Sequence, residues 1–262
     1  MSQSSTRIAI IGATGRMGTS LLDNAASSDE LEPVVAVVNP DNPSPDTLGP
    51  GDIPTSTDAA DVEKADVAID FSVPRAFVDT ARHCARAGVP LVSGTTGLSD
   101  DQWSEIDTLA DDVAILYAAN FSVGVNLLAD LVERATTGLG DDADIEIFEA
   151  HHRNKVDAPS GTAKMLGRKA ARARDRDLDD VAQWARQGHT GERSDDEIGF
   201  QVLRGGDIVG EHTAYLCIEG ERLDLTHRAT DRGIFARGAL RAAAWLSDRP
   251  AGRYDMTDVL FG

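Results

Sequence analysis

The chain has 262 residues and carries 44 acidic against 25 basic side chains, which gives a formal net charge of −19 at pH 7. A surface this acidic repels nucleic-acid backbones and anionic membranes. The sequence also lacks the run of about 18 apolar residues that a membrane span needs. At about 150 residues per domain, the length predicts one or two domains, each with room for a hydrophobic core.

The balance within each sign is also uneven, with 32 Asp against 12 Glu and 21 Arg against 4 Lys. At about 1 M salt the Debye length falls to about 3 Å, so like charges no longer repel each other strongly. Acid excess, Asp preference and Lys scarcity together favour adaptation to high intracellular salt over an ordinary acidic enzyme. Cys84 and Cys217 form no CxxC motif, and Met1–Arg7 lacks the apolar segment of a signal peptide. We therefore expect a cytoplasmic protein without structural zinc.

Apolar, β-branched runs alternate with helical stretches over residues 6–117. The predicted strands are Arg7–Ile11, Val34–Val38, Val67–Phe71, Val89–Ser93 and Val113–Tyr117. The first predicted helix ends near Ala26, the second covers Pro74–Ala87, and the third runs from a cap at Ser99 to Asp111. Asn39–Ser56 is predicted as a long loop. This alternation predicts a parallel sheet with helices on both faces.

The pattern changes after residue 121. Val123–Thr137 and Ser160–Arg174 are predicted helices, Ile145–Ala150 is a strand, and Ile198–Thr230 has the pattern of antiparallel strands with glycine-rich turns. A last helix, Gly233–Leu246, is expected to return to the first domain. The fold class is therefore α/β: a Rossmann-like dinucleotide-binding domain of residues 1–121 with 233–262, and an α+β domain of residues 122–232 with a mixed or antiparallel sheet.

Gly12–Gly18 reads GATGRMG, a relative of the dinucleotide fingerprint, between a buried strand and a helix. Glycines permit a tight turn and close approach to a pyrophosphate, and the helix N-terminus supplies free N–H groups. The alternative is a turn that merely needs glycine. The second strand ends at Asn39, not at the acid that would favour NAD, and Arg16 can reach a 2′-phosphate. We infer that NADPH is at least tolerated.

Gly94–Gly97 and Ala118–Phe121 follow the ends of later strands, where such sheets bind ligands. Their small side chains, with hydroxyl and amide groups, can line a nicotinamide pocket. Taken alone, Gly94–Gly97 is better interpreted as an ordinary turn.

The most informative segment is Glu149–Ala163, which reads EAHHRNKVDAPSGTA and joins a strand to a helix. Hydrogen-bond donors concentrate in it: His151, His152, Arg153, Lys155 and Ser160. Two adjacent histidines supply a proton donor that titrates near neutrality. Such a concentration of donors in so acidic a chain favours an anionic-substrate site over surface decoration.

The same segment opens the following helix. The first helical residues, Gly161 and Thr162, present N–H groups and a hydroxyl to a carboxylate. A metal site has thin support, because only Glu149 and Asp157 accompany the paired histidines, so we expect no metal. The basic run Arg168–Arg176 is interpreted as a solvated or subunit-facing helix, since the net charge argues against nucleic acid.

These motifs resemble those of the 4-hydroxy-tetrahydrodipicolinate reductase family, also called dihydrodipicolinate reductases, of the diaminopimelate–lysine pathway. The resemblance runs nearly end to end. It is carried by GATGRMG (12–18), DFS (70–72), SGTTG (93–97), AANFSVGVN (118–126), EAHHRNKVDAPSGTA (149–163) and RGGDIVGEH (204–212). The resemblance implies a homotetramer with a substrate-binding and oligomerisation domain, and reduction of a cyclic, anionic dicarboxylate imine by NADPH or NADH.

The resemblance also implies roles for particular residues. His151 resembles the proton donor or acceptor, and Lys155 a second proton donor that also contacts the substrate. His152 resembles a substrate-contacting histidine, and Gly161 with Thr162 a cradle for a substrate carboxylate. The cofactor-binding candidates are Gly12, Ala13, Thr14, Gly15, Arg16, Met17, Asn39, Gly94, Thr95, Thr96, Ala118, Ala119, Asn120 and Phe121.

The sequence departs from the family pattern at two positions. Asn154 stands where several members carry His, and Asn39 replaces the acid that often follows the second strand. Two other functions compete with the reductase. A dehydrogenase acting on another amino or hydroxy acid would not need the histidine–lysine segment, and a nucleotide-sensing module without catalysis would not need the carboxylate cradle.

Overall fold

The computed structural model describes residues 5–42 and 44–262, which form two compact units. The first unit comprises residues up to Val123 together with Gly233–Gly262, and the second comprises Gly124–Arg232. Each unit has its own sheet and its own apolar core.

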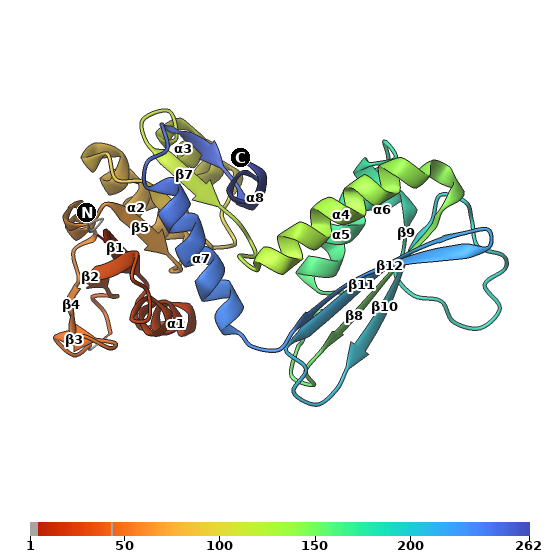
Figure 1. Ribbon diagram of the computed structural model, residues 1–262, viewed down its shortest axis with the longest axis horizontal. Helices are drawn as coiled ribbons and strands as arrows, with labels where there is room; N and C mark the ends of the chain where they lie inside the picture. The colour runs from red at the N-terminus through yellow and green to blue at the C-terminus, as the bar shows by residue number, and fades with distance from the viewer. Residues whose placement is uncertain (1–4, 43) are drawn as a thin grey trace. The chain divides into compact units, whose positions relative to one another are not determined.

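The first unit is built on a sheet with strand order β13-β7-β6-β5-β1-β2-β4-β3, parallel except for the β3–β4 pair (Figure 1). Its strands are β1 (Thr6–Ile11), β2 (Leu31–Val37), β3 (Thr47–Leu48), β4 (Ile53–Ser56), β5 (Val67–Asp70), β6 (Leu91–Ser93), β7 (Ala114–Tyr117) and β13 (Gly252–Tyr254). Its helices are α1 (Arg16–Ala25), η1 (Ala59–Lys64), α2 (Pro74–Ala87), α3 (Asp100–Leu109), α7 (Gly233–Leu246) and α8 (Met256–Phe261).

Local chemistry explains where these helices begin and end. Pro74 opens α2, and Gly88 closes it in the left-handed conformation, with φ of 67°. Ser99 caps α3 by accepting a hydrogen bond from the Gln102 N–H, and the Gln102 side chain completes a capping box. These residues end the helices where the backbone N–H and C=O groups would otherwise lack partners. Because such residues can be recognised in the sequence, the predicted boundaries of α2 and α3 agree with the structure to within two residues.

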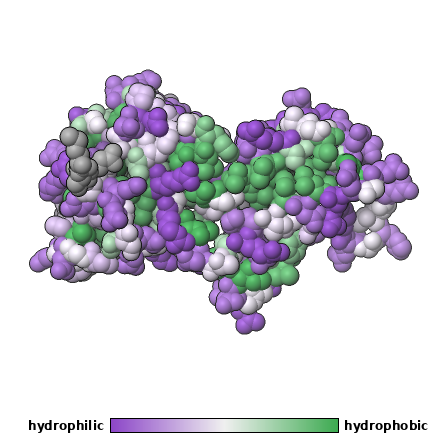
Figure 2. Space-filling view, in the orientation of Figure 1, coloured by the Kyte–Doolittle hydropathy of each residue, from purple (hydrophilic) through white to green (hydrophobic). Residues whose placement is uncertain are grey.

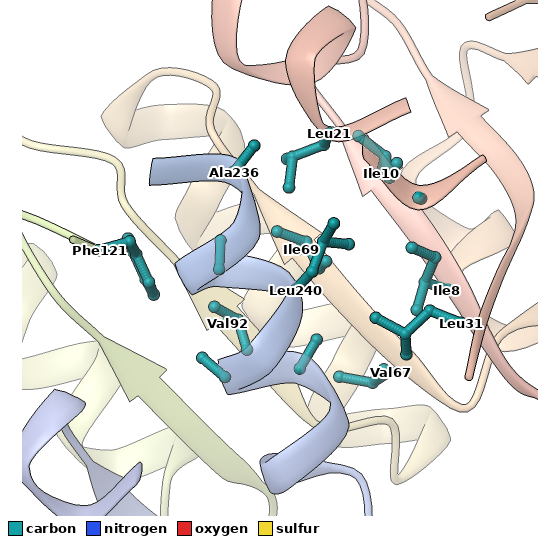
Figure 3. Close-up of a cluster of buried hydrophobic side chains, with 14 of the residues drawn as sticks. Ile8, Ile10, Leu21, Leu31, Val67, Ile69, Val92, Phe121, Ala236 and Leu240 are labelled. Carbon is teal, nitrogen blue, oxygen red and sulfur yellow. The ribbon is translucent and has the colours of Figure 1, made fainter. Parts of the chain in front are cut away.

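Apolar side chains pack on both faces of this sheet. On one face, helix α7 lays Ala236 and Leu240 against Ile69 and Val92, and Leu21 of α1 joins the same cluster (Figure 3). A second cluster joins the sheet to α2 and α3 through side chains that include Phe77 and Ile106. Burial on both faces explains why the central strands are predominantly apolar.

The second unit is a five-stranded sheet with strand order β12-β11-β8-β10-β9. Its strands are β8 (Asp144–His151), β9 (Ala182–Gln183), β10 (Ile198–Arg204), β11 (Gly210–Ile218) and β12 (Glu221–Ala229). Its helices are α4 (Val123–Leu139), η2 (Gly140–Asp142), α5 (Gly161–Arg172) and α6 (Leu178–Val181). Leu128 and Val132 of α4 and Leu166 of α5 pack with Ile145 and Ile147 of β8, so these helices share one sheet face (Figure 1).

Two expectations are corrected by this fold, and one strand was not expected. The stretch Asn39–Ser56 is not a loop throughout, because β3 and β4 extend the sheet edge, where Pro54 is tolerated. The predicted antiparallel run Ile198–Thr230 is also wrong in part. Strand β10 pairs parallel with β8, since α5 and α6 carry the chain across between them, so the sheet is mixed. Beyond Leu246, the unanticipated β13 adds a parallel strand beside β7.

Candidate active site

The glycine loop after β1 is shaped by close backbone packing. Gly12 has a φ of +75°, and a Cβ there would lie 2.6 Å from the Phe71 carbonyl oxygen. At Gly18 a Cβ would overlap the Gly12 carbonyl oxygen and the Ala13 backbone. Gly15 is the N-cap of α1. The glycines therefore bring the N-terminus of α1 tightly onto the strand ends, which fits close approach of the loop backbone to a pyrophosphate group.

The side chains around this loop agree with a dinucleotide site. Thr14, Gly15 and Arg16 are exposed at the start of α1, whereas Ala13 is buried and Met17 is half-buried. No described residue from 5–42 or 44–262 takes part in a group of three or more His, Cys, Asp or Glu side chains that could hold a metal.

The other cofactor candidates follow the carboxyl ends of parallel strands. Gly94–Thr96 follows β6 and Ala118–Phe121 follows β7, and parallel pairing places these ends at one sheet edge. A Cβ at Gly94 would enter the Phe71 ring, which contacts Phe121 edge-on at 5.4 Å between centroids. Gly94 therefore lets this loop close against an aromatic pair at the strand ends.

Asn39 follows β2, where an acid would hold a ribose hydroxyl. Its side chain is exposed, and its Oδ1 accepts a hydrogen bond from the Asp41 N–H at 3.0 Å. Asn39 thus shapes its own turn and places no charge at this strand end. Position 39 therefore carries no carboxylate that would repel a 2′-phosphate.

Asp70, which the sequence analysis did not single out, lies fully buried at the end of β5. Its carboxylate accepts hydrogen bonds from the Thr95 hydroxyl at 2.7 Å, the Ser72 N–H at 3.1 Å and the Ser72 hydroxyl at 2.9 Å. Burial raises the pKa of Asp70 to about 6, although these hydrogen bonds oppose the shift. The sequence feature that could have identified Asp70 is an acidic residue at the end of an apolar strand. Asp70 ties the loop after β5 to the loop after β6.

Replacing Asp70 with asparagine should change how stability depends on pH. A carboxyl whose pKa rises from 3.8 to about 6 on folding stabilises the protein fully below pH 3.8, and this contribution disappears as the pH rises through 6. The shift corresponds to about 3 kcal/mol. The melting temperature of the wild type relative to Asp70→Asn should therefore fall between about pH 4 and pH 7. Exposed Asp23→Asn is the control. A difference that is constant or grows with pH would contradict the prediction.

In the second unit, strand β8 ends at His151, and its pleat places Glu149 on the same face. The parallel register sets Arg204 of β10 opposite His151, and the antiparallel register sets His212 of β11 opposite Glu149. The rings of His151 and His212 meet edge-on, with centroids 5.1 Å apart. Strand pairing therefore gathers these polar side chains at the end of an otherwise apolar face.

Glu149 is fully buried and is the centre of this group. Its Oε2 lies 2.6 Å from His151 Nδ1 and 2.7 Å from Arg204 Nη1, and its Oε1 accepts from Arg204 Nη2 at 2.7 Å and from the Ser160 N–H at 2.9 Å. Burial alone would raise the pKa of Glu149, but the hydrogen bonds from His151, Arg204 and Ser160 lower it to about 2. Glu149 is therefore ionised across the physiological range.

The loop after His151 carries the remaining candidates. Lys155 Nζ lies 2.8 Å from Asp157 Oδ1, and the Lys155 N–H donates to the His152 carbonyl at 3.1 Å. The pKa of His152 is lowered by partial desolvation and by nearby cations that include Arg232. The loop is held by hydrogen bonds from the Gly205 N–H to the His151 carbonyl and from the Arg153 N–H to the Gly206 carbonyl.

Ser160 caps α5 and fixes the predicted carboxylate cradle. Its hydroxyl accepts from the Ala163 N–H at 3.1 Å and lies 3.0 Å from His212 Nε2. His212 is buried, and burial lowers its pKa to about 3, so its ring is neutral. Gly161 is exposed at the helix start, with no atom within 4 Å of a Cβ built there, and Thr162 follows it. The cradle is thus open and rigidly positioned.

The structure gathers the candidates into two groups. The cofactor candidates belong to the first unit, and His151, His152, Lys155, Gly161 and Thr162 belong to the second. The sequence analysis did not single out the roles of Arg204, His212 and Asp70, although RGGDIVGEH and DFS contain them.

The basic run Arg168–Arg176 combines buried and exposed arginines. Arg174 is buried and donates to the Gly140 carbonyl, while Arg168 and Arg172 are exposed.

A glycine loop at the carboxyl end of the first strand of a parallel sheet, in a chain whose second unit carries a candidate histidine–lysine site, defines a two-unit oxidoreductase of the nicotinamide-dependent class. Residues 6–121 match the family model "Dihydrodipicolinate reductase, N-terminus", and residues 124–260 match "Dihydrodipicolinate reductase, C-terminus". The chain therefore belongs to the dihydrodipicolinate reductase family. It reduces 4-hydroxy-tetrahydrodipicolinate with NADH or NADPH, a step of lysine and diaminopimelate biosynthesis.

Similar proteins agree on this family. A 4-hydroxy-tetrahydrodipicolinate reductase from Acinetobacter baumannii is 48% identical, covering 97% of this chain and 96% of the relative. One from Pseudoalteromonas translucida is 47% identical, covering 97% of each chain. A solved dihydrodipicolinate reductase from Paenisporosarcina sp. TG-14, bound to dipicolinate, shares the fold with a TM-score of 0.80 at 24% identity, covering 96% of this chain and 98% of that one.

Proposed function

We propose that His151 and Lys155 supply protons in this reduction. The observation that carries the proposal is the buried Glu149 carboxylate 2.6 Å from His151 Nδ1, which orients the imidazole at the end of β8. Bound NADH or NADPH supplies the hydride. Addition of hydride to a conjugated imine leaves negative charge on the ring, which a protonated His151 and Lys155 stabilise before one of them donates a proton.

The substrate that this site favours is a small dicarboxylate. Gly161 and Thr162 open α5 and receive one carboxylate at its positive end, and His152 contacts the substrate beside them. The dipicolinate bound to the Paenisporosarcina enzyme is a dicarboxylate of the same kind, which supports this assignment. Asn154 is exposed in the same loop and contributes no charge where several family members carry His.

We assign dinucleotide binding to residues 1–121 with 233–262, and substrate binding and oligomerisation to residues 122–232. The close packing that Gly12, Gly18 and Gly94 permit against neighbouring protein atoms supports a compact cofactor loop at the strand ends. In this assignment, the remaining cofactor contacts are Ala13, Thr14, Gly15, Arg16, Met17, Asn39, Thr95, Thr96, Ala118, Ala119, Asn120 and Phe121. An uncharged Asn39 after β2 and an exposed Arg16 at the start of α1 support use of NADPH as well as NADH.

We also propose a homotetramer that works in the cytoplasm. In the second unit, Leu127 and Leu131 of α4 are each 41% exposed, and apolar atoms gather over this helix (Figure 2). Leu203 of β10 and Leu223 of β12 are exposed as well. Exposed apolar groups of this kind mark protein interfaces. None of the helices within residues 5–42 and 44–262 has the length and apolarity needed to cross a membrane.

The proposed salt adaptation predicts that activity and stability both rise with KCl. Substrate and cofactor are anions, so a chain of charge −19 repels them in dilute buffer. At about 1 M KCl this repulsion is screened over about 3 Å. The assay follows oxidation of NADPH and of NADH with the freshly formed condensation product of pyruvate and aspartate semialdehyde, at increasing KCl.

Sucrose at matched osmolality is the control, because it stabilises proteins without screening charge. Full activity and stability in dilute buffer would contradict salt adaptation. Failure to oxidise either cofactor with this substrate, at any KCl concentration, would contradict the reductase assignment itself.

A further inference from the structure

We propose that Glu149 is a positioning residue that fixes the tautomer of His151 and anchors the start of α5, while Arg204 cancels the charge that Glu149 would otherwise hold beside a dianionic substrate. The proposal rests on the proposed function in one respect only, the proton-donor role of His151. It adds two positioning residues, Glu149 and Arg204, which are not among the proton-donating and substrate-contacting residues of the proposed function.

The hydrogen bonds of Glu149 define the tautomer. An ionised carboxylate only accepts hydrogen bonds, so the contact at 2.6 Å requires the hydrogen to lie on His151 Nδ1. The other ring nitrogen, Nε2, is then the atom that gains or loses a proton. Gly210 leaves room beside this atom, because a Cβ at that position would lie 3.1 Å from His151 Nε2.

The same carboxylate positions the substrate cradle. Its Oε1 accepts from the Ser160 N–H at 2.9 Å, and Ser160 is the N-cap of α5. Ser160 is also held through its hydroxyl by His212 at 3.0 Å. One buried side chain of β8 therefore fixes both the proton donor and the helix end that receives a carboxylate, although these belong to different elements.

Arg204 has a separate electrostatic role. It contacts both oxygens of Glu149 at 2.7 Å, a bidentate pair with no net charge. It also donates to the Asp157 carbonyl at 2.7 Å, and the Asp157 carboxylate holds Lys155 at 2.8 Å. Without Arg204, an uncompensated buried carboxylate would face the site of an anionic substrate, which would weaken substrate binding.

Three variants separate these roles. Glu149→Gln removes one acceptor oxygen, so the amide cannot accept from His151, Arg204 and Ser160 together. Arg204→Gln leaves the carboxylate in place. Glu146→Gln is the matched control, because Glu146 lies on the opposite face of β8 and also binds arginines, Arg186 at 2.6 Å and Arg193 at 3.4 Å.

The first readout is ¹⁵N NMR of the histidine rings, recorded without substrate or cofactor at a pH where His151 is neutral. We expect the Nδ1–H tautomer in the wild type, Glu146→Gln and Arg204→Gln, and the Nε2–H tautomer in Glu149→Gln. An Nε2–H tautomer in the wild type overturns the proposal without reference to any variant. An Nδ1–H tautomer retained in folded Glu149→Gln also overturns it.

The second readout is steady-state kinetics on variants shown to be folded by circular dichroism. Glu149→Gln should lower kcat at least about tenfold with a smaller change in KM for the imine substrate, whereas Arg204→Gln should raise KM at least about tenfold with a smaller change in kcat. Equal effects of both variants on kcat and KM overturn the division of roles. If the tautomer changes in Glu149→Gln while kcat does not, the positioning stands and the proton-donor role of His151 fails.

Discussion

Alanine at His151 is expected to lower kcat for the imine substrate by about 10²- to 10⁴-fold, the range typical for loss of a general acid. The ring is 12% exposed and hydrogen-bonded to Glu149, so its removal takes away the proposed proton donor and leaves the strand intact. The dissociation constant for NADPH, measured by its fluorescence change on binding, should stay within about twofold of the wild-type value, because position 151 belongs to the second unit and the proposed cofactor contacts belong to the first.

Lys155→Ala should also lower kcat, and it should raise KM as well, because Lys155 is proposed to contact the substrate. The matched controls are His189→Ala and Lys64→Ala, which change exposed residues outside the site. Wild-type kcat in either His151→Ala or Lys155→Ala would refute the role of that residue. A parallel loss of NADPH affinity would indicate a structural defect instead of a chemical one.

The local sequence pattern determined much of the fold because the central strands of the first unit are predominantly apolar. Residues such as Ile10 and Ile69 are fully buried, so the strands stand out against the intervening helices. Short edge strands carry no such signal. Leu48 is only partly buried, and β4 contains Pro54, which explains why the stretch after β2 resembles a loop.

The direction of β10 depended on a crossover that strand composition does not encode. Ile198–Arg204 has the apolar character of any strand in this sheet, and nothing in its residues distinguishes a parallel from an antiparallel partner. The connection through α5 and α6 decides it. A long segment with helices between two strands favours parallel pairing, whereas the short turn between β11 and β12 makes those two strands a hairpin.

In the candidate site, too, local sequence patterns could be interpreted and long-range contacts could not. His151 and Lys155 could be predicted because donors concentrate within one short segment. The partners of these residues could not, because Arg204 lies 55 positions from Glu149 in the chain and meets it only through strand register. The role of the buried Asp70 could not be predicted for a similar reason, since the hydroxyl that donates a hydrogen bond to its carboxylate belongs to Thr95, 25 residues away.

Gly12→Ala is expected to remove most dinucleotide binding and to destabilise the first unit. The φ of +75° alone costs an alanine about 1–2 kcal/mol. The added Cβ would also lie 2.6 Å from the Phe71 carbonyl oxygen, and backbone on this side of the loop cannot rotate away as a side chain can. The loop must therefore move, and with it the N-terminus of α1, so the dissociation constant for NADPH should rise at least about tenfold, equivalent to about 1.4 kcal/mol.

Gly138→Ala is the matched control for this substitution. Gly138 lies within helix α4, and a Cβ there meets no atom within 4 Å. Alanine is the better helix former by about 0.5–1 kcal/mol, so Gly138→Ala should keep wild-type affinity for NADPH and unfold at an equal or higher temperature. If Gly12→Ala binds NADPH as tightly as Gly138→Ala does, the loop tolerates the displacement and the glycine is required only by the turn. If affinity falls while the melting temperature stays unchanged, the close packing at Gly12 serves the cofactor directly.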